Sequence, residues 1–207
     1  MACLKSATST FAFLFLAFSS SVASAAGPTT DRPTFTFGSS GVSADADLRD
    51  EIPDSERQRV GDAIAAYRAA GLELPARAQA PLKYPFYPQA GILGEDLFLN
   101  NLVDLDPTGG VLDWNCSGYT YDGHLGHDTD LRSFREQAIG VPVFAVLDGR
   151  VVASHDGEPD TNTELQDVRA NYVVLDHGGG TFVYYWHLKR GSVVLRPDQS
   201  VTTGTQI

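Results

Sequence analysis

The stretch NYVVLDHGGGTFVYYWHL, residues 171–188, decides the fold class. It holds two runs rich in β-branched and aromatic residues, 171–176 and 181–187, separated by His177 and three glycines. Such runs around a glycine-rich turn predict a β-hairpin. A second hairpin is predicted where residues 142–147 and 150–154 flank Asp148-Gly149, because Asp-Gly is a strong signal for a two-residue turn.

Further strand-like runs lie on either side of these hairpins. One begins at residues 97–99, and another spans 193–196 before the turn expected at Pro197-Asp198. No long helical period interrupts the chain from Gly91 onward. The sequence therefore predicts a mainly β domain over residues 91–207, with an antiparallel sheet or sandwich as its core.

One amphipathic helix is expected upstream, at about residues 55–70. Val60, Ile64 and Tyr67 recur at helical spacing, and Asp54 or Ser55 is placed to cap the first turn. Gly71 stands where a left-handed C-terminal cap is wanted, and Leu72 follows as its usual apolar companion. We expect this helix to pack against the domain or connect to it.

The segments around the helix look irregular. Residues 26–50 are rich in Gly, Ser, Thr and Asp and read as a leader. Four prolines in residues 75–90 exclude regular helix or central strand there, so we expect a linker or an extended strap lying on the next domain. Together these parts make up a separate region, residues 26–90.

Residues 1–25 have the features of a secretory signal peptide. A single charge at Lys5 precedes an apolar run too short to span a bilayer, and Ala23-Ser24-Ala25 is typical of a cleavage site. We expect an exported protein of the periplasm, cell envelope or extracellular space, with no membrane span after cleavage. Cleavage removes Cys3, so Cys116 would be either a free thiol or a cysteine whose partner is missing.

Composition excludes some functions. The 207 residues carry a formal net charge of −11 and are 43% hydrophobic, as in an ordinary globular protein. A nucleic-acid binder would need a basic face, so no nucleic-acid partner is expected. The oligomeric state is left open.

Candidate metal ligands lie in one glycine-containing loop, His124-Leu-Gly-His-Asp128. An imidazole and a carboxylate that converge in this way can share a zinc ion and leave it positive enough to acidify water. On spacing alone, a solvated loop histidine is the better interpretation of His124.

The other histidines have simpler interpretations. His187 ends the aromatic run 184–186, where a packed side chain is the ordinary expectation. His177 is expected to be solvated in its turn, and His155 has no evident partner. His127 would point away from His124 and Asp128 in an extended segment. The nearby aspartates, Asp104, Asp106, Asp128 and Asp130, do not follow a calcium-loop pattern.

Taken in order, the segments of residues 119–207 resemble the LytM/lysostaphin-type zinc metallopeptidases, the peptidoglycan endopeptidases of family M23. The His-x-Gly-x-Asp loop is at 124–128, a β-hairpin with glycine at its turn at 141–152, a His-Gly turn at 177–178 and a Tyr-x-His-Leu strand end at 185–188. The turn at 194–201 also follows the family style. The resemblance implies that His124 and Asp128 bind Zn²⁺ and that His187 is the catalytic histidine.

The family's third zinc ligand and second catalytic histidine lie in a His-x-His motif on a later strand, and no histidine follows His187 here. Neither His127 nor His177 fits the matched pattern as a replacement. We therefore expect that the metallopeptidase core is C-terminally incomplete, that the natural protein continues beyond Ile207, and that the 207-residue chain is inactive.

The function implied by the resemblance is zinc-dependent hydrolysis of the peptide cross-links of bacterial peptidoglycan. The alternative is a non-catalytic cell-wall-binding or amidase-activating protein of the same fold. The presence of His124, Asp128 and His187 together favours the enzyme. A lipoyl- or biotin-carrier domain would need a lysine at the tip of a hairpin, and Asp148-Gly149 is followed by Arg150 instead.

Overall fold

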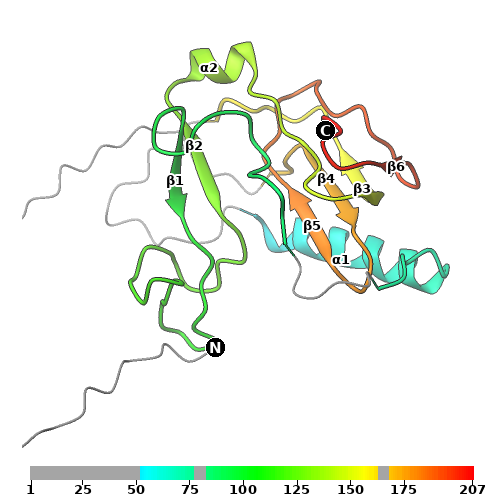
Figure 1. Cartoon of the computed structure of the whole chain (residues 1–207). Helices are drawn as coiled ribbons and strands as arrows, with labels where there is room; N and C mark the ends of the chain where they lie inside the picture. The colour runs from blue at the N-terminus through cyan, green and yellow to red at the C-terminus, as the bar shows by residue number, and fades with distance from the viewer. Residues whose placement is uncertain (1–51, 77–82, 163–167) are drawn as a thin grey trace, which may run out of the picture. The chain divides into compact units, whose positions relative to one another are not determined.

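The computed structural model describes residues 52–76, 83–162 and 168–207 (Figure 1). The predicted signal peptide and leader, residues 1–25 and 26–50, lie outside these ranges, as does the middle of the proline-rich linker. Among the described helices, none is both long and apolar enough to cross a membrane.

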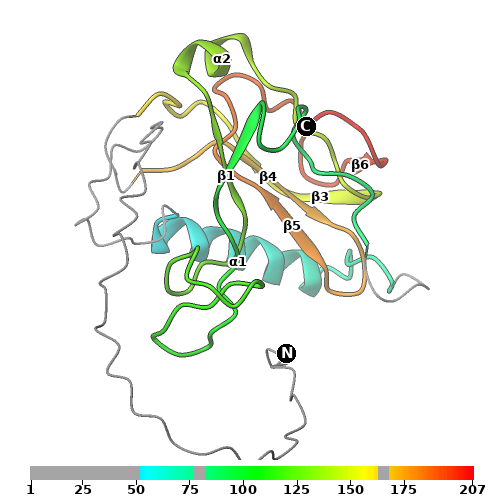
Figure 2. The ribbon, with the colours of Figure 1, turned by 60° about the vertical axis from the view of Figure 1, so that its left-hand side comes forward.

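A four-stranded antiparallel sheet forms the centre of the described structure. Its strands lie side by side in the order β5-β4-β3-β6 (Figure 2). They are β3 (Gly149–His155), β4 (Tyr172–Asp176), β5 (Phe182–Tyr185) and β6 (Ser200–Val201). A two-stranded sheet and two helices complete the regular structure: β1 (Leu97–Asn101), β2 (Asp128–Leu131), α1 (Asp54–Ala69) and α2 (Phe134–Ile139). The predicted mainly β fold with an antiparallel sheet and a preceding helix is confirmed.

Strand β4 is buried on both faces along its whole length. Val173 and Leu175 belong to one hydrophobic cluster, whereas Tyr172 and Val174 belong to the other. This alternation follows from the two-residue period of a strand. A strand covered on both sides has no polar face, which explains why its sequence is apolar throughout.

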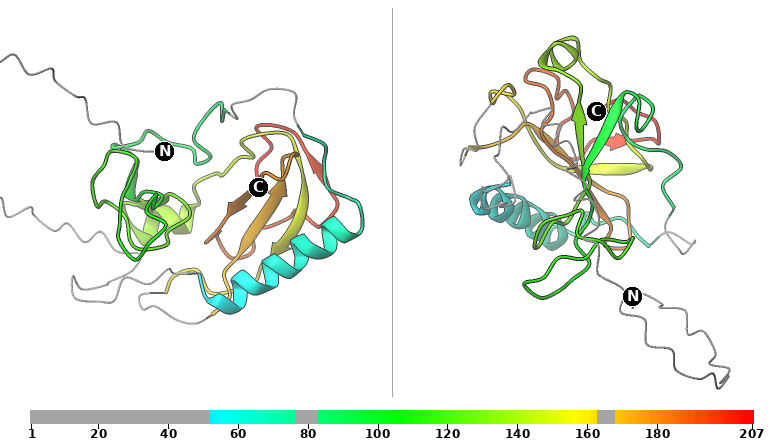
Figure 3. Two further views of the ribbon diagram at one scale, coloured as in Figure 1. Left: turned by 90° about the horizontal axis from the view of Figure 1, so that it is seen from below. Right: turned by 90° about the vertical axis from the view of Figure 1, so that its left-hand side faces the viewer.

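Helix α1 covers one face of the sheet (Figures 1 and 3). Its buried side chains Val60, Ile64 and Tyr67 pack in the same cluster as four residues of the sheet, which are Val152, Ala153, Tyr172 and Val174. The helix predicted over residues 55–70 is therefore confirmed, with its packing role.

Of the two caps predicted for α1, the C-terminal cap is confirmed and the N-terminal cap is wrong. Pro53 is the N-cap residue and no side chain caps the helix, so the capping role expected of Asp54 or Ser55 is wrong. The Pro53 carbonyl instead accepts from the N–H groups of the first turn. At the other end Gly71 has φ +69°, Gly71 N–H donates to Arg68 O and Leu72 N–H donates to Tyr67 O. These paired bonds form a Schellman motif, as the sequence predicts.

The opposite face of the sheet is covered by non-helical chain. Residues 145–147 and the segment after β5 supply its cluster, which includes Leu188, Val193, Val201 and Ile207. The covering segments hydrogen-bond across one another, since Ala145 N–H donates to Thr205 O at 2.8 Å and Ile207 N–H to Val143 O at 2.9 Å. This layer explains the second buried face of β4.

The hairpin predicted around residues 177–180 is confirmed. Strands β4 and β5 pair antiparallel, with Asp176 opposite Phe182, and His177 N–H donates to Thr181 O at 2.9 Å. The three turn glycines all have positive φ, between 62° and 88°. Other residues adopt this conformation at a cost, so the glycine run makes the turn possible.

The hairpin predicted at Asp148-Gly149 is wrong. Residues 142–147 form no strand beside β3, and β3 begins at Gly149 itself and pairs with β4 and β6. Glycine is needed here for closeness instead of turning: a Cβ on Gly149 would lie 2.6 Å from Asp176 O and 2.7 Å from His177 Nδ1. A glycine required by close packing thus looks, in the sequence, like a glycine required by a turn.

The strand predicted at residues 193–196 is also wrong, although the turn at Pro197-Asp198 is present. The segment runs along β3 with isolated contacts, such as Ser154 Oγ–H donating to Leu195 O at 2.9 Å. Only after the turn do two residues, Ser200 and Val201, pair with β3.

The described parts of the proline-rich segment lie on the core as an extended strap, as expected. Phe144 N–H donates to Pro88 O at 2.8 Å and Ala90 N–H to Pro142 O at 2.9 Å. The segment has no helix and no regular strand in the described residues between 75 and 90.

A buried carboxylate joins α1 to the sheet. Asp176, at the end of β4, is fully buried and accepts from Tyr67 Oη–H at 3.1 Å, Leu74 N–H at 2.7 Å and Gly178 N–H at 2.7 Å. Burial and the nearby Asp176 carboxylate raise the pKa of Tyr67 to about 12, so its hydroxyl stays protonated and donates.

We expect Asp176→Ala to lower the free energy of unfolding by about 3 kcal/mol, because two backbone N–H groups lose their partners. Tyr67→Phe should cost only about 1 kcal/mol, because it removes a single hydrogen bond. Urea denaturation followed by circular dichroism measures both. Asp62→Ala, on the exposed side of α1, is the control, and a loss as large as that of Asp176→Ala would contradict the assignment.

We expect Gly149→Ala to destabilise the protein by about 1–3 kcal/mol, since the added methyl group meets backbone atoms that cannot move away. Gly61→Ala is the matched control: its Cβ meets nothing within 4 Å on α1, so stability should rise by about 0.5–1 kcal/mol. Thermal and urea unfolding of the two variants should move in opposite directions, and equal effects would refute the close-packing explanation.

Candidate metal centre

The structure brings His124 and Asp128 together. Asp128 is the first residue of β2, and His124 lies in the loop that leads to it. His124 Nε2 is 3.4 Å from Asp128 Oδ2. His124 is 5% exposed, so its imidazole enters this contact from inside the protein while Asp128 keeps partial access to solvent.

Asp104 holds the loop that carries His124. Its backbone N–H donates to His124 O at 2.8 Å, and its Oδ2 accepts from Gly123 N–H at 2.9 Å. Backbone N–H groups of Asp106, Gly123 and Leu112 donate to the carboxylate and lower the pKa of Asp104. The sequence assigned no role to this residue, because the contacts that define its role come from distant backbone groups.

Asp128 is oriented from the neighbouring strand. Asn101 is its partner in the β1–β2 register, and Asn101 Nδ2–H donates to Asp128 Oδ2 at 3.1 Å. The ladder is irregular between Leu99 and Asn101, which places Asn101 opposite Asp128. Nothing in the sequence marks Asn101, since this contact depends on strand pairing.

His124 Nε2 has unused bonding capacity. It is buried and has no hydrogen-bond partner among the described residues, a state that normally costs free energy. Two ligand atoms of a tetrahedral zinc ion, each about 2.1 Å from the metal, lie about 3.4 Å apart. The nitrogen and oxygen found here are the donor types that zinc prefers, so the pair fits two positions of a zinc site.

The described residues bring no third ligand to this place. No group of three or more His, Cys, Asp or Glu side chains among them could hold a metal ion. Catalytic zinc sites ordinarily have three protein ligands. His124 and Asp128 alone therefore fall short of the three protein ligands that a catalytic zinc site ordinarily has.

His187 follows β5, which ends at Tyr185, two residues before it. Its backbone lies in the left-handed region, with φ +55°. The side chain reaches solvent, yet the surrounding protein desolvates the imidazole and lowers its pKa, while the charge of Asp128 acts in the opposite direction. Asp128 and His187 are thus close enough to interact electrostatically, although they are distant in sequence.

Two histidines differ from expectation. His177, expected to be solvated, is 1% exposed and its Nδ1 lies 2.9 Å from Asp148 O. His155, expected to lack a partner, has its Nε2 2.7 Å from Glu158 Oε1. Asp148 approaches His177 only in the folded chain, whereas Glu158 lies three residues after His155 and is a local partner.

His127 is exposed, as a residue pointing away from the ligand pair would be. Desolvation first, and then the nearby His124, lower its pKa, while Asp128 raises it. The imidazole is therefore within electrostatic range of His124 and Asp128.

Cys116 is disulfide-bonded in this structure. It sits in a turn built around the buried Asp113, whose carboxylate accepts from backbone N–H groups of Asn115, Ser117 and Tyr119.

A pocket adjoins the His124 loop. It has a volume of about 300 Å³, and its lining comes from residues 104–108 and from Asp122, Gly123 and Leu125. Gly123 and Leu125 flank His124, so a molecule in this pocket would lie close to the ligand pair.

Part of the chain matches a known protein family. Residues 130–207 match the model of Peptidase family M23. No curated protein and no solved structure matches the chain significantly. The matched segment begins in β2 and contains His187 and all four strands of the central sheet. Residues 130–207 of this chain therefore belong to peptidase family M23.

Proposed function

We propose that the protein is a zinc-dependent endopeptidase that hydrolyses peptide cross-links of bacterial peptidoglycan. The observation that carries this proposal is the buried His124 Nε2, which faces Asp128 Oδ2 at 3.4 Å without a hydrogen bond of its own. Family membership supports a metallopeptidase, and the resemblance to LytM and lysostaphin enzymes supports the substrate.

In this proposal His124 and Asp128 hold the zinc ion. When bound, zinc supplies Lewis acidity, which lowers the pKa of water and polarises a peptide carbonyl. Asn101 orients Asp128 by its hydrogen bond, and Asp104 fixes the backbone on both sides of the His124 peptide. These hydrogen bonds would orient the two proposed ligands before a metal ion binds.

His187 is the proposed catalytic histidine. Desolvation lowers its pKa, so its imidazole is neutral at neutral pH and ready to accept a proton. The Asp128 charge stabilises the imidazolium that this proton transfer would form. Exposure of the side chain leaves the imidazole accessible to a substrate.

We also propose that residues 1–25 direct export to the periplasm, cell envelope or extracellular space, where peptidoglycan is reached. Residues 26–90 then form a leader and linker region ahead of the metallopeptidase core, residues 91–207. The alternative is a non-catalytic cell-wall-binding or amidase-activating protein of the same fold.

We expect the protein of residues 26–207 to bind Zn²⁺ weakly, with a dependence on both proposed ligands. His124→Ala and Asp128→Ala should each reduce the affinity for Zn²⁺ at least about 100-fold. Losing a residue that only hydrogen-bonds to a metal ligand already costs up to about 100-fold, and these two residues are the proposed ligands themselves. Isothermal titration calorimetry and Co²⁺ absorption measure this. His155→Ala is the control, because that imidazole faces Glu158. Stoichiometric zinc after dialysis, or binding unaffected by His124→Ala, would contradict the assignment.

We expect the same protein to release no muropeptides from peptidoglycan, because a third ligand is needed. A chimera that joins the His-x-His strands of an active family member after Ile207 should cleave cross-links in a zinc-dependent way. In that chimera, His187→Ala should lower the rate by about 10²–10⁴-fold. Liquid chromatography with mass spectrometry identifies the new termini.

The outcomes separate the two functions. A zinc-loaded chimera that binds peptidoglycan but leaves every cross-link intact would favour the non-catalytic alternative. Zinc-dependent release of muropeptides by the protein of residues 26–207 itself would contradict the requirement for a third ligand. It would still support peptidoglycan as the substrate.

A further inference from the structure

The strand pairing beside His187 is shifted by one residue. In the β4–β5 register Val173 faces Tyr185, and its continuation would place His187 opposite Asn171. The N–H that reaches Asn171 O, at 2.9 Å, belongs instead to Leu188. One extra residue is thus accommodated at His187, as in a β-bulge, and such irregularities redirect side chains.

The shift depends on a costly backbone conformation. His187 has φ +55°, where a residue with a Cβ is disfavoured by about 1–2 kcal/mol. Residues held in such conformations persist only when neighbouring contacts hold them there. The contacts on either side of His187 therefore help to hold its backbone in this conformation.

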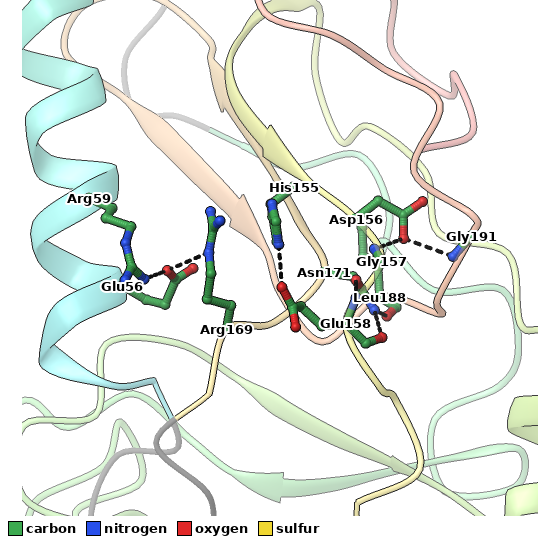
Figure 4. A network of polar contacts seen from close by, with 10 residues as sticks. All are labelled: Glu56, Arg59, His155, Asp156, Gly157, Glu158, Arg169, Asn171, Leu188 and Gly191. Atoms are coloured by element: carbon green, nitrogen blue, oxygen red, sulfur yellow. Dashed lines mark hydrogen bonds and ion pairs between the residues drawn. The ribbon is translucent and has the colours of Figure 1, made fainter.

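Asn171 provides contacts of this kind directly after His187. Its side chain is 2% exposed, and Nδ2 donates to Leu188 O at 2.9 Å and to Glu158 O at 3.0 Å (Figure 4). Its Oδ1 accepts from Glu158 N–H at 2.8 Å. Together with the backbone bond, both polar backbone groups of Leu188 are bonded to one residue, Asn171.

The chain beyond Leu188 is held by different side chains. Asp160 Oδ2 accepts from Arg190 N–H at 2.7 Å, and Asp156 accepts from Gly191 N–H at 2.8 Å and from Val193 N–H at 3.2 Å. Figure 4 shows Asp156 beside Gly191, while Asn171 lies beside Leu188 and Glu158. Loss of the Asn171 amide would therefore act mainly at Leu188 and His187, because the segment downstream keeps its anchors.

We propose that Asn171 is a positioning residue for His187. Its amide takes the place of regular strand pairing where the ladder is shifted, and it holds Leu188 so that His187 keeps its left-handed conformation. The inference rests on the proposed function in one respect: the position of His187 matters for catalysis only if His187 is the catalytic histidine. Misplacement of a catalytic group by about 1 Å can cost about 100-fold in rate.

The test compares Asn171→Ala and Asn171→Asp with the wild-type protein of residues 26–207. Asn171→Asp keeps an acceptor for Glu158 N–H but loses the donor to Leu188 O. We expect both variants to shift the NMR signals of the His187 ring and the Leu188 amide and to change the rate at which diethylpyrocarbonate modifies His187. Signals from α1 should stay in place. Unchanged His187 signals and reactivity in a folded Asn171→Ala protein would overturn the proposal.

Glu158→Gln is the matched control. It changes the side chain that faces His155 but keeps the backbone groups that bond to Asn171, so the His187 signals should be unaffected. A shift of His187 signals in this variant equal to that in Asn171→Ala would overturn the assignment to Asn171. Neither metal nor substrate is needed, so failure of zinc binding or cleavage counts against the proposed function alone.

A measurement on the wild-type protein covers the case in which neither Asn171 variant folds. The Asn171 side-chain NH₂ group and the Leu188 amide should exchange hydrogen slowly, because both are buried and bonded. Rapid exchange of both groups would overturn the proposal. In the zinc-loaded chimera, a folded Asn171→Ala variant should lose up to about 100-fold in kcat with KM little changed.

Discussion

Burial of β4 on both faces is the constraint on which the rest of the described structure depends. An apolar strand with no polar face is stable only if both sides are covered. Helix α1 covers one side, and the chain around residues 145–147, together with the segment after β5, covers the other. Asn171 at one end of this strand and Asp176 at the other then become fully enclosed polar groups, and each must find partners inside the protein.

Those two enclosed residues link the core to function in different ways. Asp176 uses its carboxylate to tie the end of α1 and the following segment to the β4–β5 turn. Asn171 uses its amide to hold the residue after His187. A rigid strand thus fixes a helix at one end and a reactive side chain at the other, which is how a buried scaffold can position a site that reaches solvent.

The candidate metal centre is assembled from segments that are distant in sequence. Asp104 holds the His124 loop, Asn101 orients Asp128 across the β1–β2 pair, and His187 arrives from the end of β5. Asp128 interacts with both histidines: its charge acts on His187, and its carboxylate faces His124. The buried His124 Nε2 makes no hydrogen bond among the described residues, so it is available as a metal ligand in the tautomer that leaves it unprotonated.

Local patterns in the sequence determined the elements whose physics is local. Helix α1 is recognisable from the helical spacing of Val60, Ile64 and Tyr67 and from Gly71 after them. Both the apolar face of a helix and its Schellman cap are formed by residues close together in the sequence. The apolar run of β4 and the three glycines after it mark the hairpin for the same reason. The spacing of His124 and Asp128 likewise marks the candidate ligands, since one short loop carries both.

Only the tertiary structure decided features that depend on distant neighbours. Asp148-Gly149 looks like a turn, yet Gly149 serves the close approach of β4, and His177 in its glycine turn is buried against Asp148. The role of Asn171 is visible only once Leu188 pairs with it out of register. In each case the deciding contact joins residues far apart in the chain, so no local period or spacing can encode it.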